Sequence, residues 1–286
     1  MSQTSAQTED AVGLLLGKER RLREYLNSKS DVVVAFSGGV DSSYLAVVAS
    51  QELGPRALCV MGVSPSVSEY QRKSAIDFAD RHGLNLRVVE TGEVAKPEYV
   101  ANNPDRCFHC KSELYSVLGL IPDASESILD GTNADDLKDF RPGRRAASER
   151  GVISPLAEIG FSKMEIRELS KRMGLETWDV PASPCLSSRI AHGTAATPQR
   201  LQMVETAEGF LRSLGFLEFR VRVHDEIARV EIARNEIERF LDTDTFEEVA
   251  TRFKEIGFRF VTLDLEGFRS GSMNPDSGKR IFNIKR

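Results

Sequence analysis

The stretch VVVAFSGGVDSS at residues 32–43 decides the fold of this chain. Its apolar, β-branched half ends at Ser-Gly-Gly, a pattern typical of a buried parallel strand that leads into a tight turn. The apolar residues after Ser42 then predict a helix up to Ala49. A glycine-rich turn between a strand and a helix N-terminus is suited to bind phosphate, because its backbone N–H groups and the helix dipole both attract anions.

The side chains of this turn indicate how a phosphate would be held. The residues expected to contact it are Ser37, Gly38, Gly39, Asp41, Ser42 and Ser43. Serine hydroxyls donate hydrogen bonds, glycine lets the backbone come close, and Asp41 is expected to hold a Mg²⁺ that screens the phosphate charge. The lysine of the Walker signature G-x-x-x-x-G-K-[ST] is absent, so this is not a kinase-type loop.

The string SGGVDSS at residues 37–43 resembles the PP-loop of the ATP pyrophosphatase superfamily. This resemblance implies an enzyme that binds ATP, cleaves it between the α and β phosphates and forms an adenylated intermediate. An ordinary strand–turn–helix with a glycine-rich turn is the plain alternative. Three hydroxyls and an aspartate in register after the strand favour the ATP site.

Composition is that of an enzyme with more than one domain. The 286 residues exceed the usual size of a single domain, so two domains are expected. No apolar run approaches about 18 residues and no basic-then-apolar leader is seen, which predicts neither a membrane span nor a secretory signal. Four cysteines in such a chain indicate a reducing cytoplasm and thiol or metal chemistry. A net charge of −5 gives no overall positive potential that would attract nucleic acid.

Strand and helix signals alternate in the first part of the chain. Strands are expected at residues 32–36, 57–63, 84–89 and 127–129, and helices at 11–26, 42–49, 68–82, 113–120 and 162–173. This alternation predicts an α/β fold with a doubly wound parallel sheet, which binds ligands at the carboxyl ends of its strands. Met61 and Thr132 lie near two such ends, so both are expected to contact the nucleotide. Asp136 nearby is expected to ligate Mg²⁺ or to cap a turn.

The pattern changes beyond Thr194. A helix is expected at residues 198–214, strands at 218–224 and 227–232, a helix at 246–256 and a strand at 258–265. This order predicts a second, smaller α+β domain. We therefore expect a PP-loop domain at residues 1–194, a substrate-binding or oligomerisation domain at residues 195–286, and a homo-oligomer.

The four cysteines fall into two classes. Cys59 lies within an apolar strand, where a buried and inert thiol is expected. Cys107 and Cys110, in a proline-containing loop before a helix, have the spacing that lets two sulfurs face one metal. A tetrahedral zinc site would lack two ligands. Together with Cys185, three thiolates suit an iron–sulfur cluster with one open position, provided the fold brings them together; the alternative is two loop thiols without a ligand.

Further motifs narrow the resemblance to the LarE group of PP-loop sulfur transferases. Besides SGGVDSS, the matching stretches are NPDRCFHCK at 103–111, DGTNADDLKDFRPG at 130–143 and WDVPASPCLSSRI at 178–190. The resemblance covers nearly the whole chain. It implies an ATP-dependent sulfur transferase that adenylates a carboxylate of pyridinium-3,5-biscarboxylate mononucleotide and converts it to a thiocarboxylate, in the biosynthesis of the nickel-pincer nucleotide cofactor.

The resemblance assigns the sulfur chemistry to Cys185. In the LarE group the matching cysteine gives up its own sulfur and becomes dehydroalanine, or three cysteines hold a [4Fe–4S] cluster that carries the transferable sulfur. Cys107, Cys110 and Cys185 match the three-cysteine pattern, which favours the cluster. Ser188 and Arg189 stand close to Cys185, and a hydroxyl and a guanidinium there favour a thiolate.

Charged residues of the C-terminal strands complete the predicted site. Arg220 and Arg222 alternate along a strand and therefore share one face. With Ser188 and Arg189 they are expected to bind the substrate, and Glu231 on the partner strand is expected to bind a metal such as Mg²⁺. An ordinary salt-bridged sheet face is the alternative.

Two other functions remain open from the sequence. A tRNA-thiolating PP-loop enzyme is disfavoured by the acidic net charge and by the lack of paired zinc motifs. An amide-forming synthetase of the NAD or GMP synthetase type needs an ammonia source and makes no use of Cys185. The expected partner is therefore a small-molecule pyridinium mononucleotide, not a nucleic acid or a membrane.

Overall fold

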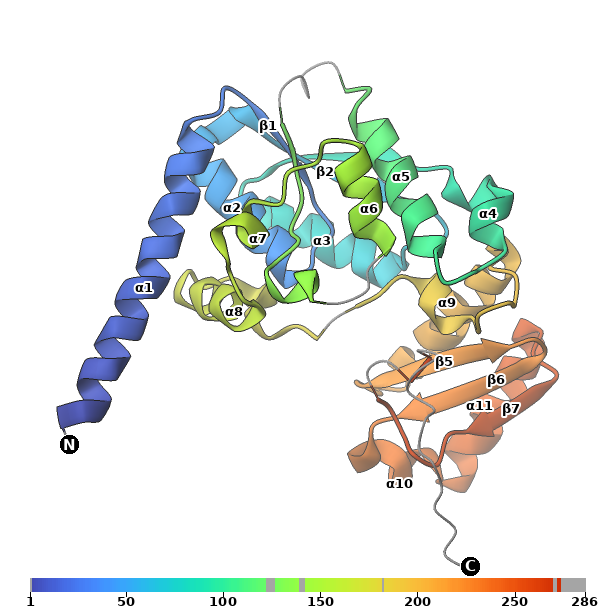
Figure 1. Cartoon of the computed structure of the whole chain (residues 1–286). Helices are drawn as coiled ribbons and strands as arrows, with labels where there is room; N and C mark the ends of the chain where they lie inside the picture. The colour runs from blue at the N-terminus through green and yellow to red at the C-terminus, as the bar shows by residue number, and fades with distance from the viewer. Residues whose placement is uncertain (1, 122–126, 139–141, 182, 270–271, 274–286) are drawn as a thin grey trace, which may run out of the picture. The chain divides into compact units, whose positions relative to one another are not determined.

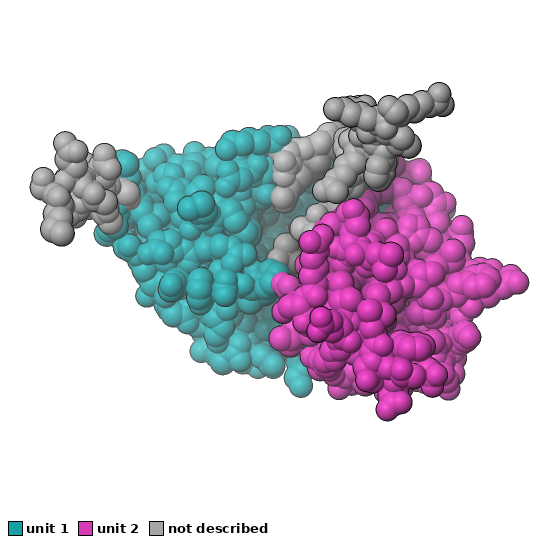
Figure 2. Space-filling view, turned by 90° about the horizontal axis from the view of Figure 1, so that it is seen from below, with its two compact units in different colours: residues 1–64, 69–93, 105–183 teal, residues 65–68, 94–104, 184–286 magenta. Residues whose placement is uncertain are grey.

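The computed structural model describes residues 2–121, 127–138, 142–181, 183–269 and 272–273, with side chains from Val12 onward. The chain divides into two compact units (Figure 2). Unit 1 comprises Met1–Ser64, Glu69–Glu93 and Asp105–Ser183, and unit 2 comprises Pro65–Ser68, Val94–Pro104 and Pro184–Arg286. Among the helices of the described ranges, none has the length and apolar character needed to cross a membrane.

Unit 1 is built on a parallel sheet of four strands in the order β3-β2-β1-β4 (Figure 1). The strands are β1 (Val32–Ala35), β2 (Ala57–Val63), β3 (Asn85–Glu90) and β4 (Ile128–Leu129). Val33 of β1 lies opposite Leu58 of β2 and Ile128 of β4, so the strand that leads into the phosphate loop is central. All residues of β1 are buried, as expected for a parallel strand covered on both faces. The predicted α/β sheet is confirmed.

Helices cover both faces of this sheet (Figure 1). The helices of unit 1 are α1 (Ser2–Asn27), α2 (Val40–Leu53), α3 (Glu69–Arg81), α5 (Arg106–Leu118), α6 (Pro142–Glu149), α7 (Pro155–Ile159) and α8 (Lys163–Arg172), of which α1 packs on α2 and α7. Its 3₁₀ turns are Gly54–Arg56, Asp135–Leu137 and Glu176–Asp179, and a further one, Glu93–Ala95, begins at the last residue of a unit 1 segment. Val33 shares a buried cluster with Tyr115 of α5 and Ala146 of α6. Phe36, which points to the opposite face, stacks on Phe78 of α3 with ring centroids 6.1 Å apart.

Unit 2 is a smaller α+β unit. Its elements are α4 (Pro97–Val100), α9 (Pro198–Ser213), β5 (Phe219–His224), β6 (Ile227–Ile232), α10 (Ile237–Phe240), α11 (Thr243–Ile256) and β7 (Phe260–Leu263), with 3₁₀ turns at Leu186–Arg189 and Arg234–Glu236. β5 and β6 are antiparallel, and β7 joins β6 in parallel. α9 lies against β5 and α11 against β7 (Figure 1). Val221 and Val230, which face each other across β5 and β6, are fully buried.

The units divide the chain differently from the predicted boundary between residues 194 and 195. Unit 2 begins at Pro184 and also takes in Val94–Pro104. The side-chain amide of Asn102, which is buried, donates to three carbonyls of the later segment, those of Ile190, Ala191 and Thr194, at 3.2, 2.8 and 2.9 Å. Hydrogen bonds between residues so far apart in the chain produce no pattern in the local sequence. The sequence therefore did not predict that these two segments belong to unit 2.

The helix expected from Glu113 begins earlier. α5 starts at Arg106, so Cys107 and Cys110 lie in its first turns and not in a preceding loop. Pro104 disfavours helical backbone at the residue before it, whereas no residue after it opposes a helix. The expected proline-containing loop therefore ends before both cysteines.

Two glycines allow neighbouring segments to approach the phosphate loop. Gly38 has φ +72°, in the left-handed region, and a Cβ there would lie 2.7 Å from the Cβ of Ala75 in α3. Gly131 follows β4, and a Cβ on it would lie 2.8 Å from the backbone nitrogen of Ser42. The segment after β4 and the start of α2 are therefore in direct backbone contact at the carboxyl edge of the sheet.

Replacing Gly131 with alanine should force this contact apart. We expect Gly131→Ala to lower the free energy of unfolding by about 1–3 kcal/mol, because the added methyl group meets backbone that has little room to move. Gly209 in α9 is the matched control, since no atom lies within 4 Å of its added Cβ. Gly209→Ala should raise the free energy of unfolding by about 0.5–1 kcal/mol through helix propensity. Urea denaturation measures both, and a Gly131→Ala protein as stable as the parent would contradict the argument.

Candidate active site

The phosphate loop, residues 37–43, is held in shape by its own serine hydroxyls. The Oγ of Ser42 accepts a hydrogen bond from the backbone N–H of Ser37 at 3.2 Å and donates to the carbonyl of Gly39 at 3.1 Å. The hydroxyl oxygens of Ser37 and Ser42 are 3.1 Å apart. Because α2 begins at Val40, within this loop, the positive end of its dipole acts there.

A cavity of about 420 Å³ opens at the loop, within the size range of small-molecule sites. Of the residues predicted to bind ATP, those that line it are Ser37, Gly39, Asp41, Ser42 and Thr132. The other three do not line it. Gly38 shapes the turn, the hydroxyl of Ser43 is buried with no hydrogen-bond partner in the described part of the chain, and Met61 is buried in β2.

Asp130 joins the segments around this cavity. Its Oδ2 accepts hydrogen bonds from the hydroxyls of Tyr115 and Thr132 at 3.0 and 2.9 Å. Its Oδ1 accepts from the hydroxyl of Ser154 at 2.7 Å and from the backbone N–H of Thr132 at 3.1 Å. Burial, together with the negative charge of Asp130, raises the pKa of Tyr115 far above its usual value, so this phenol remains a hydrogen-bond donor. Asp130 directly follows β4, at the carboxyl edge of the sheet. Nothing in the sequence indicated that Tyr115 would be one of its hydrogen-bond partners.

Asp41 forms an ion pair that the sequence did not reveal. The ammonium of Lys163, the first residue of α8, lies 2.6 Å from Oδ2 of Asp41. Burial raises the pKa of Asp41 above its ordinary value, and Lys163 opposes this rise. A lysine in the first turn of a surface helix is common, so the sequence does not mark Lys163 as a partner of Asp41. The ion pair is seen only in the folded structure.

The acidic residues at this edge fit a Mg²⁺ ion bound together with ATP. Asp41 and Asp136 both line the cavity, and Oδ1 of Asp41 is buried without a hydrogen-bond partner among the described residues. In the same ranges, no three His, Cys, Asp or Glu side chains come together in a way that could hold a metal ion. Mg²⁺ usually takes one or two carboxylates and completes its octahedron with water and substrate phosphates, so two carboxylates are sufficient.

Cys107 and Cys110 lie one turn apart on α5, beside the same cavity. Cys107, Lys111 and Tyr115, spaced four residues apart, line it. Cys107 is exposed and Cys110 is half-buried. Cys185, the third predicted cluster ligand, belongs to unit 2. The cluster therefore stays a prediction.

Cys59 is a structural residue, as predicted. It lies in β2 with no exposed surface. Burial raises the pKa of its thiol to about 12, so the thiolate is not formed near neutral pH.

In unit 2, Cys185 immediately precedes a short 3₁₀ turn whose last residue is Arg189. The buried guanidinium of Arg189 donates to the carbonyl of Cys185 at 3.1 Å, to the carbonyl of Pro184, and to the hydroxyl of Ser188 at 3.0 Å. Its other nitrogens pair with Glu208 of α9, which is also buried, with the nearest nitrogen 3.0 Å from the carboxylate. The backbone around Cys185 is therefore fixed by a buried charge.

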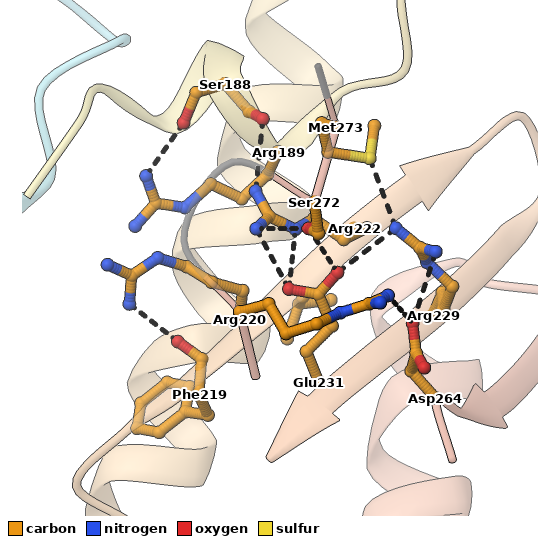
Figure 3. Close-up of polar contacts among 12 residues, drawn as sticks. Ser188, Arg189, Phe219, Arg220, Arg222, Arg229, Glu231, Asp264, Ser272 and Met273 are labelled. Atoms are coloured by element: carbon orange, nitrogen blue, oxygen red, sulfur yellow. Dashed lines mark hydrogen bonds and ion pairs between the residues drawn. The ribbon is translucent and has the colours of Figure 1, made fainter. Parts of the chain in front are cut away.

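The polar face of β5 and β6 adjoins this turn (Figure 3). Arg222 donates to the carbonyl of Ser188 at 3.2 Å. Both carboxylate oxygens of the fully buried Glu231 are occupied, by Arg222 at 2.9 Å, Arg229 at 3.1 Å and the hydroxyl of Ser272 at 2.7 Å. A metal ion at Glu231 would compete with two guanidinium groups, so this geometry does not support the predicted metal role.

Arg220 extends from the same face. It donates to the carbonyl of Phe219 at 2.7 Å, and its guanidinium carbon lies 5.0 Å from the ring centroid of Phe268. Burial first, and then the neighbouring cations Arg189 and Arg222, lower the pKa of Arg220 to about 10. The structure thus brings together, in unit 2, the four residues predicted to bind substrate, Ser188, Arg189, Arg220 and Arg222. Such a group of guanidiniums is suited to carboxylate or phosphate.

Known proteins resemble this chain over almost its whole length. An uncharacterised protein of Synechocystis sp. is 42% identical over 263 residues, which are 91% of this chain and 98% of that protein. The pyridinium-3,5-bisthiocarboxylic acid mononucleotide synthase of Lactiplantibacillus plantarum is 37% identical over 263 residues, 91% of this chain and 95% of that enzyme. The chain belongs to the LarE family.

The relationship to other PP-loop proteins is more distant. The NAD synthase family model matches residues 17–103. A subunit of the glutamine-hydrolysing GMP synthase of Thermoplasma acidophilum is 29% identical over 201 residues, 63% of this chain and 62% of that subunit. The predicted LarE family and PP-loop superfamily are confirmed, and at the level of the family this chain is an ATP-using sulfurtransferase.

In the native protein, a thiol-alkylating reagent should modify Cys107 and spare Cys59. Cys107 is exposed, whereas the Cys59 thiol is buried and its pKa is about 12. Brief treatment with iodoacetamide followed by peptide mass spectrometry measures both, and the urea-unfolded protein, in which both should react, is the control. Equal labelling of the two cysteines in the native state would show that β2 is not packed as described.

Replacing Lys163 with methionine should shift the acid limb of ATP-dependent pyrophosphate release to higher pH. As a predicted ligand of the nucleotide's metal ion, Asp41 must be ionised, and burial already raises its pKa. Loss of the ammonium 2.6 Å away raises it further, so Asp41 becomes protonated, and activity falls, at a higher pH on acidification. Lys138→Met is the control, because that side chain is 79% exposed. Identical pH profiles for Lys163→Met and the parent would rule out this role for the ion pair.

Proposed function

We propose that this protein uses ATP to adenylate a carboxylate of pyridinium-3,5-biscarboxylate mononucleotide and converts it into a thiocarboxylate, in nickel-pincer nucleotide cofactor biosynthesis. The observation that carries the proposal is the setting of Cys185, whose backbone carbonyl accepts a hydrogen bond from Arg189, in a turn that Arg222 of β5 also contacts. The relative from L. plantarum is named as a bisthiocarboxylic acid mononucleotide synthase. A thiocarboxylate differs from a carboxylate by one sulfur atom, so its formation needs a sulfur donor.

Unit 1 supplies the activation of the carboxylate. A carboxylate is a poor electrophile; attack of its oxygen on the α-phosphorus of ATP releases pyrophosphate and gives an acyl adenylate, from which AMP leaves readily. Ser37, Ser42 and the start of α2 are placed to hold the polyphosphate. Mg²⁺, when bound at Asp41 and Asp136, would offset the charge of the phosphates.

Unit 2 supplies the binding of an anionic substrate. The proposed substrate carries two carboxylates and a phosphate, which guanidinium groups bind through paired hydrogen bonds. We assign Arg220, with Ser188, to these anions. Arg189 and Arg222 act as positioning residues, because the nitrogens of each are engaged by a buried glutamate and by the backbone of the Cys185 turn.

In the first version of the proposal, Cys185 is the sulfur nucleophile. Its Sγ attacks the carbonyl carbon of the acyl adenylate, a C–S bond forms, and AMP leaves with the electron pair of the broken C–O bond. If Cys185 is itself the donor, loss of its Cα proton and cleavage of its Cβ–Sγ bond then release the thiocarboxylate and leave dehydroalanine. If another sulfur is used, Cys185 is not consumed.

A [4Fe–4S] cluster is the second sulfur source within the proposal. Cys107, Cys110 and Cys185 would hold it as thiolates, the ligands that such clusters take. Cys107 and Cys110 share one side of α5 because they are three residues apart. The three-cysteine pattern favours this version, in which an open iron position would carry the transferred sulfide.

One anaerobic experiment separates the two sources. After reaction with ATP, substrate and inorganic sulfide, we expect an unchanged protein mass and more than one turnover, and Cys107→Ser or Cys110→Ser should abolish turnover. A single turnover with a loss of about 34 Da, the mass of H₂S, would instead identify Cys185 as the consumed donor. Cys59→Ser, at a buried position outside the site, is the control and should remain active. Sulfur transfer by Cys185→Ser would overturn the role of Cys185 in both versions of the proposal.

An amide-forming synthetase is the second candidate, and the matches to NAD and GMP synthases favour it. The NAD synthase match ends at residue 103, however, and does not include Cys185. ATP-dependent amide formation from ammonia, unaffected by Cys185→Ser, would support this alternative. Salt-sensitive binding of tRNA would support the tRNA-thiolating one.

A further inference from the structure

The cavity at the phosphate loop is lined by two groups of opposite charge. The carboxylates of Asp41 and Asp136 come from the start of α2 and from the 3₁₀ turn after β4. Two cations, Lys111 of α5 and Arg144 of α6, come from the other helices that line it. Neither cation belongs to the phosphate loop or to the pair of carboxylates expected to bind Mg²⁺.

Lys111 extends over the ring of Tyr115. Its ammonium lies 5.5 Å from the ring centroid of Tyr115. Tyr115 is one turn further along α5, on the same cavity-lining face. No carboxylate in the described ranges forms an ion pair with Lys111. A half-buried ammonium that lines a cavity without a carboxylate partner is well placed to receive an anion.

Arg144 belongs to the same wall. A Cβ on the preceding Gly143 would lie 3.1 Å from Cγ of Lys111, so the start of α6 packs directly on this lysine. One guanidinium nitrogen of Arg144 donates to the carbonyl of Leu137 at 3.1 Å. A guanidinium has five N–H donors, and the bond to Leu137 uses one of them.

We infer that Lys111 and Arg144 bind the β- and γ-phosphates of ATP and hold the pyrophosphate that leaves, from the side of the cavity opposite the phosphate loop. This inference rests on the proposed function, in which ATP is cleaved to AMP and pyrophosphate. Serine hydroxyls and backbone N–H groups of the loop orient the phosphates but carry no charge. As the Pα–O bond breaks, negative charge accumulates on the leaving oxygen, and fixed cations aimed at that oxygen stabilise it.

The neighbour of Arg144 provides a matched comparison. The guanidinium of Arg145 stacks on Phe108, 3.8 Å from the ring centroid, and pairs with Glu149 at 3.5 Å. It does not line the cavity. Two adjacent arginines of α6 thus differ in whether they face the phosphate loop, although both carry the same charge.

Titration calorimetry on the full chain with Mg²⁺ and inorganic pyrophosphate tests the assignment. We expect Lys111→Met and Arg144→Gln each to weaken pyrophosphate binding by about 10- to 100-fold, the usual effect of losing a charge-assisted hydrogen bond. Binding of AMP should change by less than about twofold, because AMP lacks the two outer phosphates. Lys111→Met keeps the aliphatic stem that packs on Gly143, and Lys111→Arg should restore most of the affinity.

Arg145→Gln and Lys138→Met are the controls and should bind pyrophosphate like the parent protein. Parental affinity for pyrophosphate in both Lys111→Met and Arg144→Gln overturns the inference. So does an equal weakening of AMP and pyrophosphate binding, which would reflect a general change in the cavity; thermal unfolding of each variant shows whether its fold is intact. The titration contains no substrate, so it is independent of sulfur transfer. If the parent binds pyrophosphate but never releases it from ATP with a carboxylate substrate, the proposed function fails while the assignment of Lys111 and Arg144 stands.

Discussion

The cavity at the phosphate loop depends on one buried carboxylate, that of Asp130. A buried charge without partners is strongly destabilising, so the donors of Asp130 must stay in place whenever the fold is intact. Those donors come from three segments, through Tyr115 of α5, Thr132 and Ser154. The next residue, Gly131, touches the start of α2 because it has no side chain. One carboxylate thus fixes α5, with its cysteines and lysine, relative to the phosphate loop.

Unit 2 uses buried ion pairs for the same purpose. Arg189 with Glu208, and Arg222 with Glu231, are pairs in which both side chains are almost inaccessible. Such pairs add little stability compared with apolar packing, but removing one partner costs about 3–5 kcal/mol. Their effect is therefore on geometry: each guanidinium also donates to the backbone of the Cys185 turn, so the backbone of this turn cannot shift without breaking bonds to a buried charge.

The sequence predicted the features that depend on local pattern. The central strand with its glycine-rich turn and the strand Ile227–Ile232 stand where they were expected, because periodicity acts over a few residues. The partners of Asp41 and Asn102 were not predictable. Lys163 and the carbonyls after Cys185 reach them from more than 80 residues away in the chain, and no alternation or spacing marks such contacts.

The charges of the two units are complementary to the molecules proposed to bind them. In unit 1, Asp41 is half-buried and its pKa is raised in spite of the ion pair with Lys163, so the ionised carboxylate is in an unfavourable setting that a divalent cation would relieve. In unit 2, Arg220 is in the opposite state: burial and neighbouring cations lower its pKa to about 10, so an anion beside it would be stabilising. Both groups keep a charge that the folded protein alone disfavours. Charged residues whose ionised form destabilises the folded protein are characteristic of binding sites, because the bound ligand supplies the compensating charge. The proposed magnesium nucleotide and polyanionic substrate would supply charges that compensate these two groups.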